Sequence, residues 1–203
     1  MAPDTPIRIL IYLLHCDLRL SDNPIFHEIQ QSFESGSAKF THLLPLYILR
    51  PHQIETSGFI PVEEDAKSTP QSPYPEARSK VAGFWRCGPH KAKFIAESVW
   101  DLKNTLEQKE SSLIIRVGKV RDILRGIFHH VEKTGDSSVS SSLQQQVVGV
   151  WMTKGDGCEE RQEEAGVKEL VEELGREYRE FQDEKYYVHE YGFHVFATEV
   201  CMA

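Results

Sequence analysis

Short runs of apolar, mostly aliphatic residues alternate along this chain with segments of helical periodicity. The first run, residues 7–14, is apolar apart from Arg8, as expected of a strand that is covered on both faces. Between the runs, apolar residues recur at helical spacing and charged residues lie opposite them. This alternation predicts strands over residues 7–14, 41–49, 113–117, 147–152 and 180–188, and helices over residues 24–34, 89–106, 120–131 and 159–178.

Elements in this order form a doubly wound α/β fold, in which a parallel sheet carries helices on both faces and the crossovers are right-handed. We therefore predict a Rossmann-like, five-stranded parallel sheet of order 3-2-1-4-5. Ligands of such sheets bind beyond the carboxyl ends of the strands, at the point where the strand order reverses. This rule places a candidate site in residues 15–19 and residues 153–158 before any family is considered.

The candidate binding residues lie in these two loops. The first loop contributes His15 and Asp17, and the second contributes Thr153, Lys154, Gly155 and Asp156. No catalytic residue is predicted, and no metal site either, because the four cysteines form no CxxC pair. The first strand is not followed by a GxGxxG motif, and Gly118-Lys119 lacks the partner glycine of a phosphate loop, since Leu113 stands in its place.

Composition sets the remaining limits. We divide the chain into a domain over residues 1–188, with a long proline-rich connection at residues 50–89, and a divergent tail at residues 189–203. The net charge of −8 argues against a large phosphate-binding face, so DNA binding by this chain alone is not expected. We find no apolar run of membrane-spanning length and no secretory or transit signal, and expect a cytoplasmic or nuclear protein.

Three stretches resemble one family. Residues 15–24, HCDLRLSDNP, resemble the R-x-D-L-R-x-x-D-N opening of the photolyase/cryptochrome family, with His15 in place of the first arginine. Residues 84–99, FWRCGPHKAKFIAESV, are similar to DASH-type cryptochromes, especially fungal ones. Residues 151–160, WMTKGDGCEE, match the loop that carries a chromophore-binding carboxylate in that family. The resemblance covers residues 7–188 and implies an N-terminal antenna-type domain.

The resemblance also implies a cofactor. The family's antenna is methenyltetrahydrofolate, whose pterin edge a carboxylate can grip with two hydrogen bonds. The expected glutamate falls at Gly155, and Asp156 either substitutes for it or is simply a turn residue between two glycines. We expect folate to bind weakly. FAD is not expected in this chain, because the family holds it in a C-terminal helical domain that we do not find. Glu159, Glu160, Glu163 and Glu164 are explained by the helix macrodipole.

Three functions remain open at this point. The first is a stand-alone light-harvesting or interaction module of a DASH-type cryptochrome, which is no enzyme by itself. The second is a short isoform that acts as a light-independent regulatory protein, and the third is part of a flavin-dependent DNA photolyase completed in trans. Because the surface that would meet the helical domain is apolar, we expect self-association or a protein partner there.

Overall fold

The computed structural model describes residues 6–15, 17–54, 77–79, 81, 83–134 and 145–183. Its centre is a five-stranded sheet of order β3-β2-β1-β4-β5. The strands are β1 (Ile7–Leu14), β2 (His42–Leu49), β3 (Ile114–Val117), β4 (Gln145–Thr153) and β5 (Glu177–Phe181). All four pairings are parallel, which confirms the predicted fold class and strand order.

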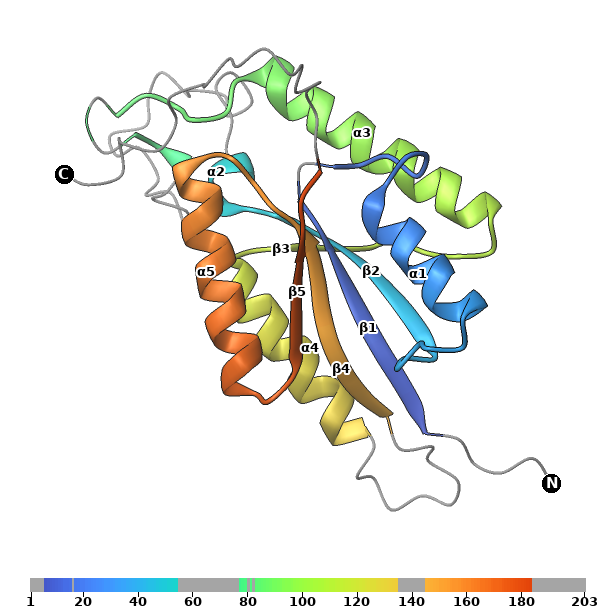
Figure 1. Cartoon of the computed structure of the whole chain (residues 1–203). Coiled ribbons are helices and arrows are strands. Elements are labelled where there is room, and N and C mark those ends of the chain that lie inside the picture. The colour runs from blue at the N-terminus through green and yellow to red at the C-terminus, as the bar shows by residue number, and fades with distance from the viewer. Residues whose placement is uncertain are drawn as a thin grey trace, which may run out of the picture.

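Helices cover both faces of the sheet (Figure 1). On one face lie α1 (Pro24–Glu34) and α3 (Pro89–Gln108), and on the other lie α4 (Val120–Thr134) and α5 (Cys158–Glu173). A short helix, α2 (Pro51–Ile54), follows β2 directly. Alternate residues of β1 enter the two cores, so that Leu10 packs with α1 and α3, whereas Ile11 packs with α4 and α5.

Local sequence signals account for the starts and stops of these elements. The Asn23 side chain accepts hydrogen bonds from the backbone N–H groups of Ile25 and Phe26, so α1 begins at Pro24 as its capping sequence predicts. Gly118 ends β3 with a φ of +140°, a conformation that residues with a side chain rarely adopt. These two turns bring the next helices back across the sheet.

The end of the chain corrects one prediction. The predicted helix over residues 159–178 stops at Glu173, and β5 begins at Glu177, three residues before its predicted start. The cause is Gly175, whose φ of +66° terminates the helix in the left-handed conformation. The tail at residues 189–203 and the connection at residues 55–76 lie outside the described residues. Within the described part of the chain, none of the helices is both long and apolar enough to span a membrane.

Candidate functional site

A cleft of about 770 Å³ lies at the carboxyl edge of the sheet. Its walls come from the ends of β1 and β2, from α2, and from the facing helices α3, α4 and α5. The lining combines apolar and aromatic side chains with cations, among them Leu18, Tyr47, Phe94, Ile95, Val120, Arg50, Arg86, Lys91, Lys119 and Arg121. A concave site with this mixture is suited to a planar ligand that carries negative charge.

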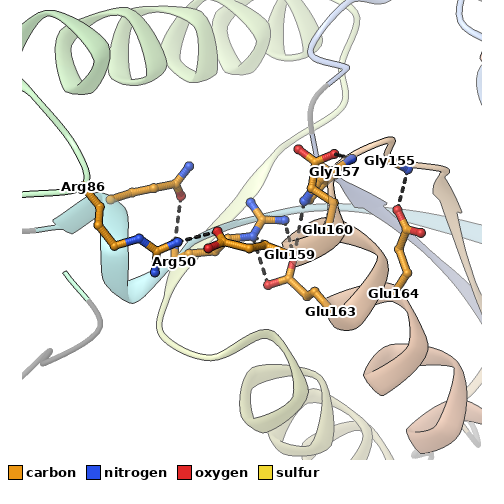
Figure 2. Close-up of polar contacts among 10 residues, drawn as sticks. Arg50, Arg86, Gly155, Gly157, Glu159, Glu160, Glu163 and Glu164 are labelled. Atoms are coloured by element: carbon orange, nitrogen blue, oxygen red, sulfur yellow. Dashed lines mark hydrogen bonds and ion pairs between the residues drawn. The ribbon is translucent and has the colours of Figure 1, made fainter. Parts of the chain in front are cut away.

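A buried ion cluster forms one side of the cleft (Figure 2). The Glu163 carboxylate of α5 accepts from Arg50, with Nε 2.7 Å and Nη2 2.6 Å from Oε2. Nε2 of His15 lies 3.4 Å from the same oxygen. Arg50 and His15 are only 9% and 7% exposed, so the carboxylate offsets much of the cost of burying the arginine's charge. Glu163 thereby ties α5 to the ends of β1 and β2.

Two other glutamates of α5 accept hydrogen bonds from the backbone of the loop between β4 and α5. Figure 2 shows Glu164 directed at Gly155 and Glu160 directed at Gly157. Glu164 accepts the backbone N–H of Gly155, and Glu160 accepts that of Gly157 at 3.1 Å. Burial raises the pKa of Glu164, although the Gly155 N–H opposes that shift. Each of these two carboxylates therefore accepts a hydrogen bond from one particular backbone N–H group. This contact is more specific than the interaction with the helix macrodipole that the sequence predicted for them.

Gly155 is the position at which the family resemblance implies a carboxylate. A Cβ atom built on Gly155 would lie 2.6 Å from Oε2 and 2.7 Å from Cβ of Glu160. It would also lie 2.9 Å from Oε1 of Glu164. The space that a side chain at this position would enter is therefore filled by carboxylates from α5.

The predicted residues of this loop lie beside the cleft and do not line it. Thr153 is buried at the end of β4, and Lys154 is exposed while its backbone N–H donates to the Phe181 carbonyl at 2.8 Å. Asp156 is exposed at the tip of the loop. The structure thus leaves Asp156 accessible to a ligand from outside, and its role in binding stays a prediction.

Of the two residues predicted in the first loop, His15 lines the cleft and Asp17 does not. Asp17 is 5% exposed and accepts from Asn23 Nδ2 at 3.2 Å and from Arg19 Nε at 3.1 Å. Asn23 also donates to the Tyr12 hydroxyl at 2.9 Å, and burial raises the pKa of Tyr12. These contacts tie the loop to the first turn of α1, which gives Asp17 a structural role in addition to any predicted one.

Sequence reasoning missed the cations of the cleft. Arg50 directly follows β2, so the rule that selected the ends of β1 and β4 also applies to it. Arg86 belongs to the connection before α3 and pairs with Glu159 of α5, a contact that no periodicity indicates. His52 of α2 also lines the cleft, and its pKa is lowered by burial and by the positive charges of Arg86 and Arg50. In the described part of the chain, no group of three metal-ligating residues occurs.

Solved structures share this fold. A Synechocystis cryptochrome superposes with a TM-score of 0.59 at 17% identity, over 88% of this chain and 28% of its own. A Sulfolobus tokodaii photolyase superposes with a TM-score of 0.52 at 16% identity, over 86% of this chain and 29% of its own. At these identities the likeness establishes the fold alone.

Sequence relatives are closer. A cryptochrome DASH of Gibberella zeae is 42% identical over 89% of this chain, and a mitochondrial cryptochrome DASH of Neurospora crassa is 38% identical over 91%. The chain spans about a quarter of each relative's length, 23% in both cases. The Neurospora protein is designated mitochondrial. This designation contradicts the cytoplasmic or nuclear location that we expected from the sequence, so that expectation is wrong.

The family assignment rests on the length of the matched region. The DNA photolyase family model matches residues 10–192, which include the sheet apart from the first three residues of β1 and both loops at its carboxyl edge. The fungal DASH relatives match 181 and 185 residues of this chain. This chain belongs to the DNA photolyase family and corresponds to the α/β region of its DASH-type cryptochromes.

Proposed function

We propose that this chain is an antenna-type light-harvesting module of a DASH-type cryptochrome and that the carboxyl-edge cleft holds its chromophore. The observation that carries the proposal is the cleft itself, about 770 Å³ beyond the ends of β1 and β2, beside the point between β1 and β4 where the strand order reverses. The Sulfolobus tokodaii photolyase has the same fold, and its structure contains two FAD molecules, which implies a novel light-harvesting cofactor in that protein. A folate, which the family resemblance implies, is therefore one candidate ligand, and a flavin bound as an antenna is a second one, although no FAD was expected from the sequence.

The residues of the cleft fit such a molecule. Phe94, which is exposed, offers aromatic surface for a planar ring, while Lys91 and Lys119 supply positive charge for a carboxylate or phosphate. Glu160 borders both the cleft and the loop after β4, so its carboxylate can accept from the donor edge of a pterin. Asp156 would provide a second carboxylate from the loop. When bound, a methenyltetrahydrofolate would supply absorption in the near ultraviolet.

We expect weak retention of the folate by the chain alone. Phe94, which forms part of the wall, is 71% exposed, so the cleft is open to solvent beside α3. A tightly held ligand needs most of its surface buried. The carboxyl-edge cleft of this chain should therefore bind methenyltetrahydrofolate reversibly and lose it during gel filtration.

Gly166 offers a test with a matched control. This residue lines the cleft from α5, and a Cβ atom at this position would meet nothing within 4 Å. Gly166→Phe should place a ring inside the cleft and reduce the affinity for methenyltetrahydrofolate or FAD at least tenfold in equilibrium dialysis. Gly166→Ala should leave that affinity within twofold of the wild type. Equal binding by both variants, or binding of neither chromophore by the wild type, would contradict the proposal.

A second candidate function, protein docking, is favoured by apolar exposure on α3. Phe94 and Trp100 are 71% and 59% exposed, and Phe84, just before the helix, is 63% exposed. Large apolar side chains that stay exposed in one part of the chain can belong to a contact surface. Sedimentation velocity of Phe94→Ser/Trp100→Ser against the wild type tests self-association in this region, which should weaken in the variant. Thymine-dimer repair with added full-length protein tests the photolyase alternative.

A further inference from the structure

The carboxyl-edge cleft differs from a groove beside α1 in having charged side chains that a ligand can reach. The groove, of about 420 Å³, lies between α1 and the strands β4 and β5 and shares none of its lining residues with the cleft. Its aromatic side chains, Phe40 and Trp151, are only 4% and 5% exposed. In the cleft, Lys91, Lys119 and Glu159 are exposed. The charges of the cleft are therefore the groups that can meet a ligand directly.

Two arginines of the cleft pair with glutamates of α5, and the two pairs differ in burial (Figure 2). The side chains of Arg50 and Glu163 are 11% and 24% exposed, and Arg50 donates through both Nε and Nη2. Arg86 donates through Nη2 to Oε2 of Glu159, and these side chains are 29% and 75% exposed. A buried ion pair is costly to separate, whereas an exposed one contributes little to stability. Arg86 is therefore the arginine whose partner a ligand can replace.

The backbone of Arg86 is held in place at one wall of the cleft. Its N–H donates to the Ala77 carbonyl at 3.0 Å. The preceding residue, Trp85, forms a β-bridge with Arg78, whose guanidinium lies 4.0 Å from the centre of the Trp85 ring. The next residue, Cys87, is fully buried. Because the backbone is fixed, only the side chain of Arg86 has to move when its partner changes, which keeps the cost of the exchange low.

The charges around Arg86 favour an anion. His52 lines the cleft in the same region, and its pKa is lowered by burial and then by the positive charges of Arg86 and Arg50. Lys91 lowers this pKa as well, whereas Glu159 raises it. Positive charge therefore dominates at this wall even while Glu159 is present, and a negatively charged group of a ligand is attracted to it.

We propose that Glu159 is a built-in competitor, which pairs with Arg86 until an anionic group of the bound chromophore displaces it. This role of Glu159 rests on the proposed function of the cleft and identifies the residue that opposes binding there. The displacing group is the pyrophosphate of FAD or a carboxylate of methenyltetrahydrofolate, since a guanidinium binds phosphates and carboxylates alike through paired hydrogen bonds. Loss of Glu159 should therefore strengthen binding, although this residue lines the cleft.

Glu159→Gln removes the competing charge and keeps the shape of the side chain. Because an exposed ion pair is weak, the variant should bind FAD about threefold to fivefold more tightly in equilibrium dialysis. Riboflavin, which has the same ring system and no phosphate, should bind equally to the variant and the wild type. Glu172→Gln is the matched control, since it removes the same charge from a 60% exposed position of α5 that pairs with Lys168. Its affinity for FAD should equal that of the wild type.

The same comparison with methenyltetrahydrofolate distinguishes a carboxylate from a phosphate as the displacing group. A gain with either chromophore in Glu159→Gln alone supports the proposal. Arg86→Gln then separates a change of partner from a general effect of charge. This variant should bind the chromophore more weakly, and Glu159→Gln should bring no gain when the two substitutions are combined.

A gain from Glu159→Gln that persists without Arg86 would overturn the proposal, and so would equal affinities in Glu159→Gln and Glu172→Gln. Either result would leave the cleft as the chromophore site. If the wild type binds neither chromophore, the proposed function fails instead. The same variants are then compared with inorganic pyrophosphate, through the backbone amide signal of Arg86 in the ¹⁵N-labelled chain. Equal pyrophosphate affinities in Glu159→Gln and Glu172→Gln would overturn the competitor role by itself.

Discussion

Arg50 and Arg8 lie at opposite ends of the sheet and show how differently its two cavities are built. Arg50 follows β2 at the carboxyl-edge cleft and makes contacts of 2.6 to 3.0 Å with Glu163. Arg8 lies near the start of β1 in the groove beside α1, and its Nε has no acceptor in the described structure. The charge of Arg50 stabilises the edge of the sheet, whereas that of Arg8 forms no ion pair among the described residues.

The largest expected effect is the loss of Arg50. Arg50→Met should lower the free energy of unfolding by about 3 kcal/mol, because it leaves Glu163 in a partly buried site without its main cation. The same substitution at Arg8 should change the free energy of unfolding by less than about 0.5 kcal/mol, since no ion pair is broken. Urea unfolding at neutral pH measures both values, and equal losses would show that the comparison between the two arginines is wrong.

A smaller effect is expected where α5 closes the loop after β4. Gly155→Ala places a Cβ atom 2.7 Å from Cβ of Glu160, so α5 or the loop must shift. We expect a loss of about 1–3 kcal/mol in the free energy of unfolding. Gly166 lies on α5, where a Cβ atom would meet open space, so Gly166→Ala should instead stabilise the protein by about 0.5–1 kcal/mol. Thermal unfolding should move the two midpoints in opposite directions, and a wild-type midpoint for Gly155→Ala would refute the close contact.

The smallest effect is a dependence on pH. Burial raises the pKa of Glu164 above that of an exposed glutamate, about 4.3, so the folded state holds this proton more tightly than the unfolded state. Its contribution to stability is full below that pH and is lost as the pH rises through the raised pKa. Glu164→Gln keeps an acceptor for the Gly155 N–H and removes the titration. The fall in urea midpoint between pH 4 and pH 7.5 should therefore be shallower in this variant, and parallel profiles would exclude the effect.

The fold could be read from the sequence more fully than the site. Strand order followed from the alternation of apolar runs and helical periods, and the cap at Asn23 marked the start of α1. The end of α5 was predicted too late because Leu174 continues the apolar pattern up to Gly175, whose left-handed φ decides the boundary. That position alone could have indicated the stop.

The site was harder to predict because its contacts join distant segments. His15 and Arg50 both follow strands, so topology brings them to one edge, but their shared carboxylate comes from Glu163, more than one hundred residues away in sequence. The close approach of Glu160 and Glu164 of α5 to Gly155 likewise depends on how the helix packs. Neither contact can be predicted from the spacing of residues along the chain.

Chemical-shift mapping with methenyltetrahydrofolate tests the central proposal most directly. If the carboxyl-edge cleft holds the chromophore, the backbone amide signals of Gln53, Ser98 and Gly166, which line it from three helices, should shift together with one saturation curve. The amide of Val148, in the groove beside α1, should stay unchanged. Saturation without shifts at the three cleft residues, or shifts confined to the groove, would contradict the assignment of the cleft as the chromophore site.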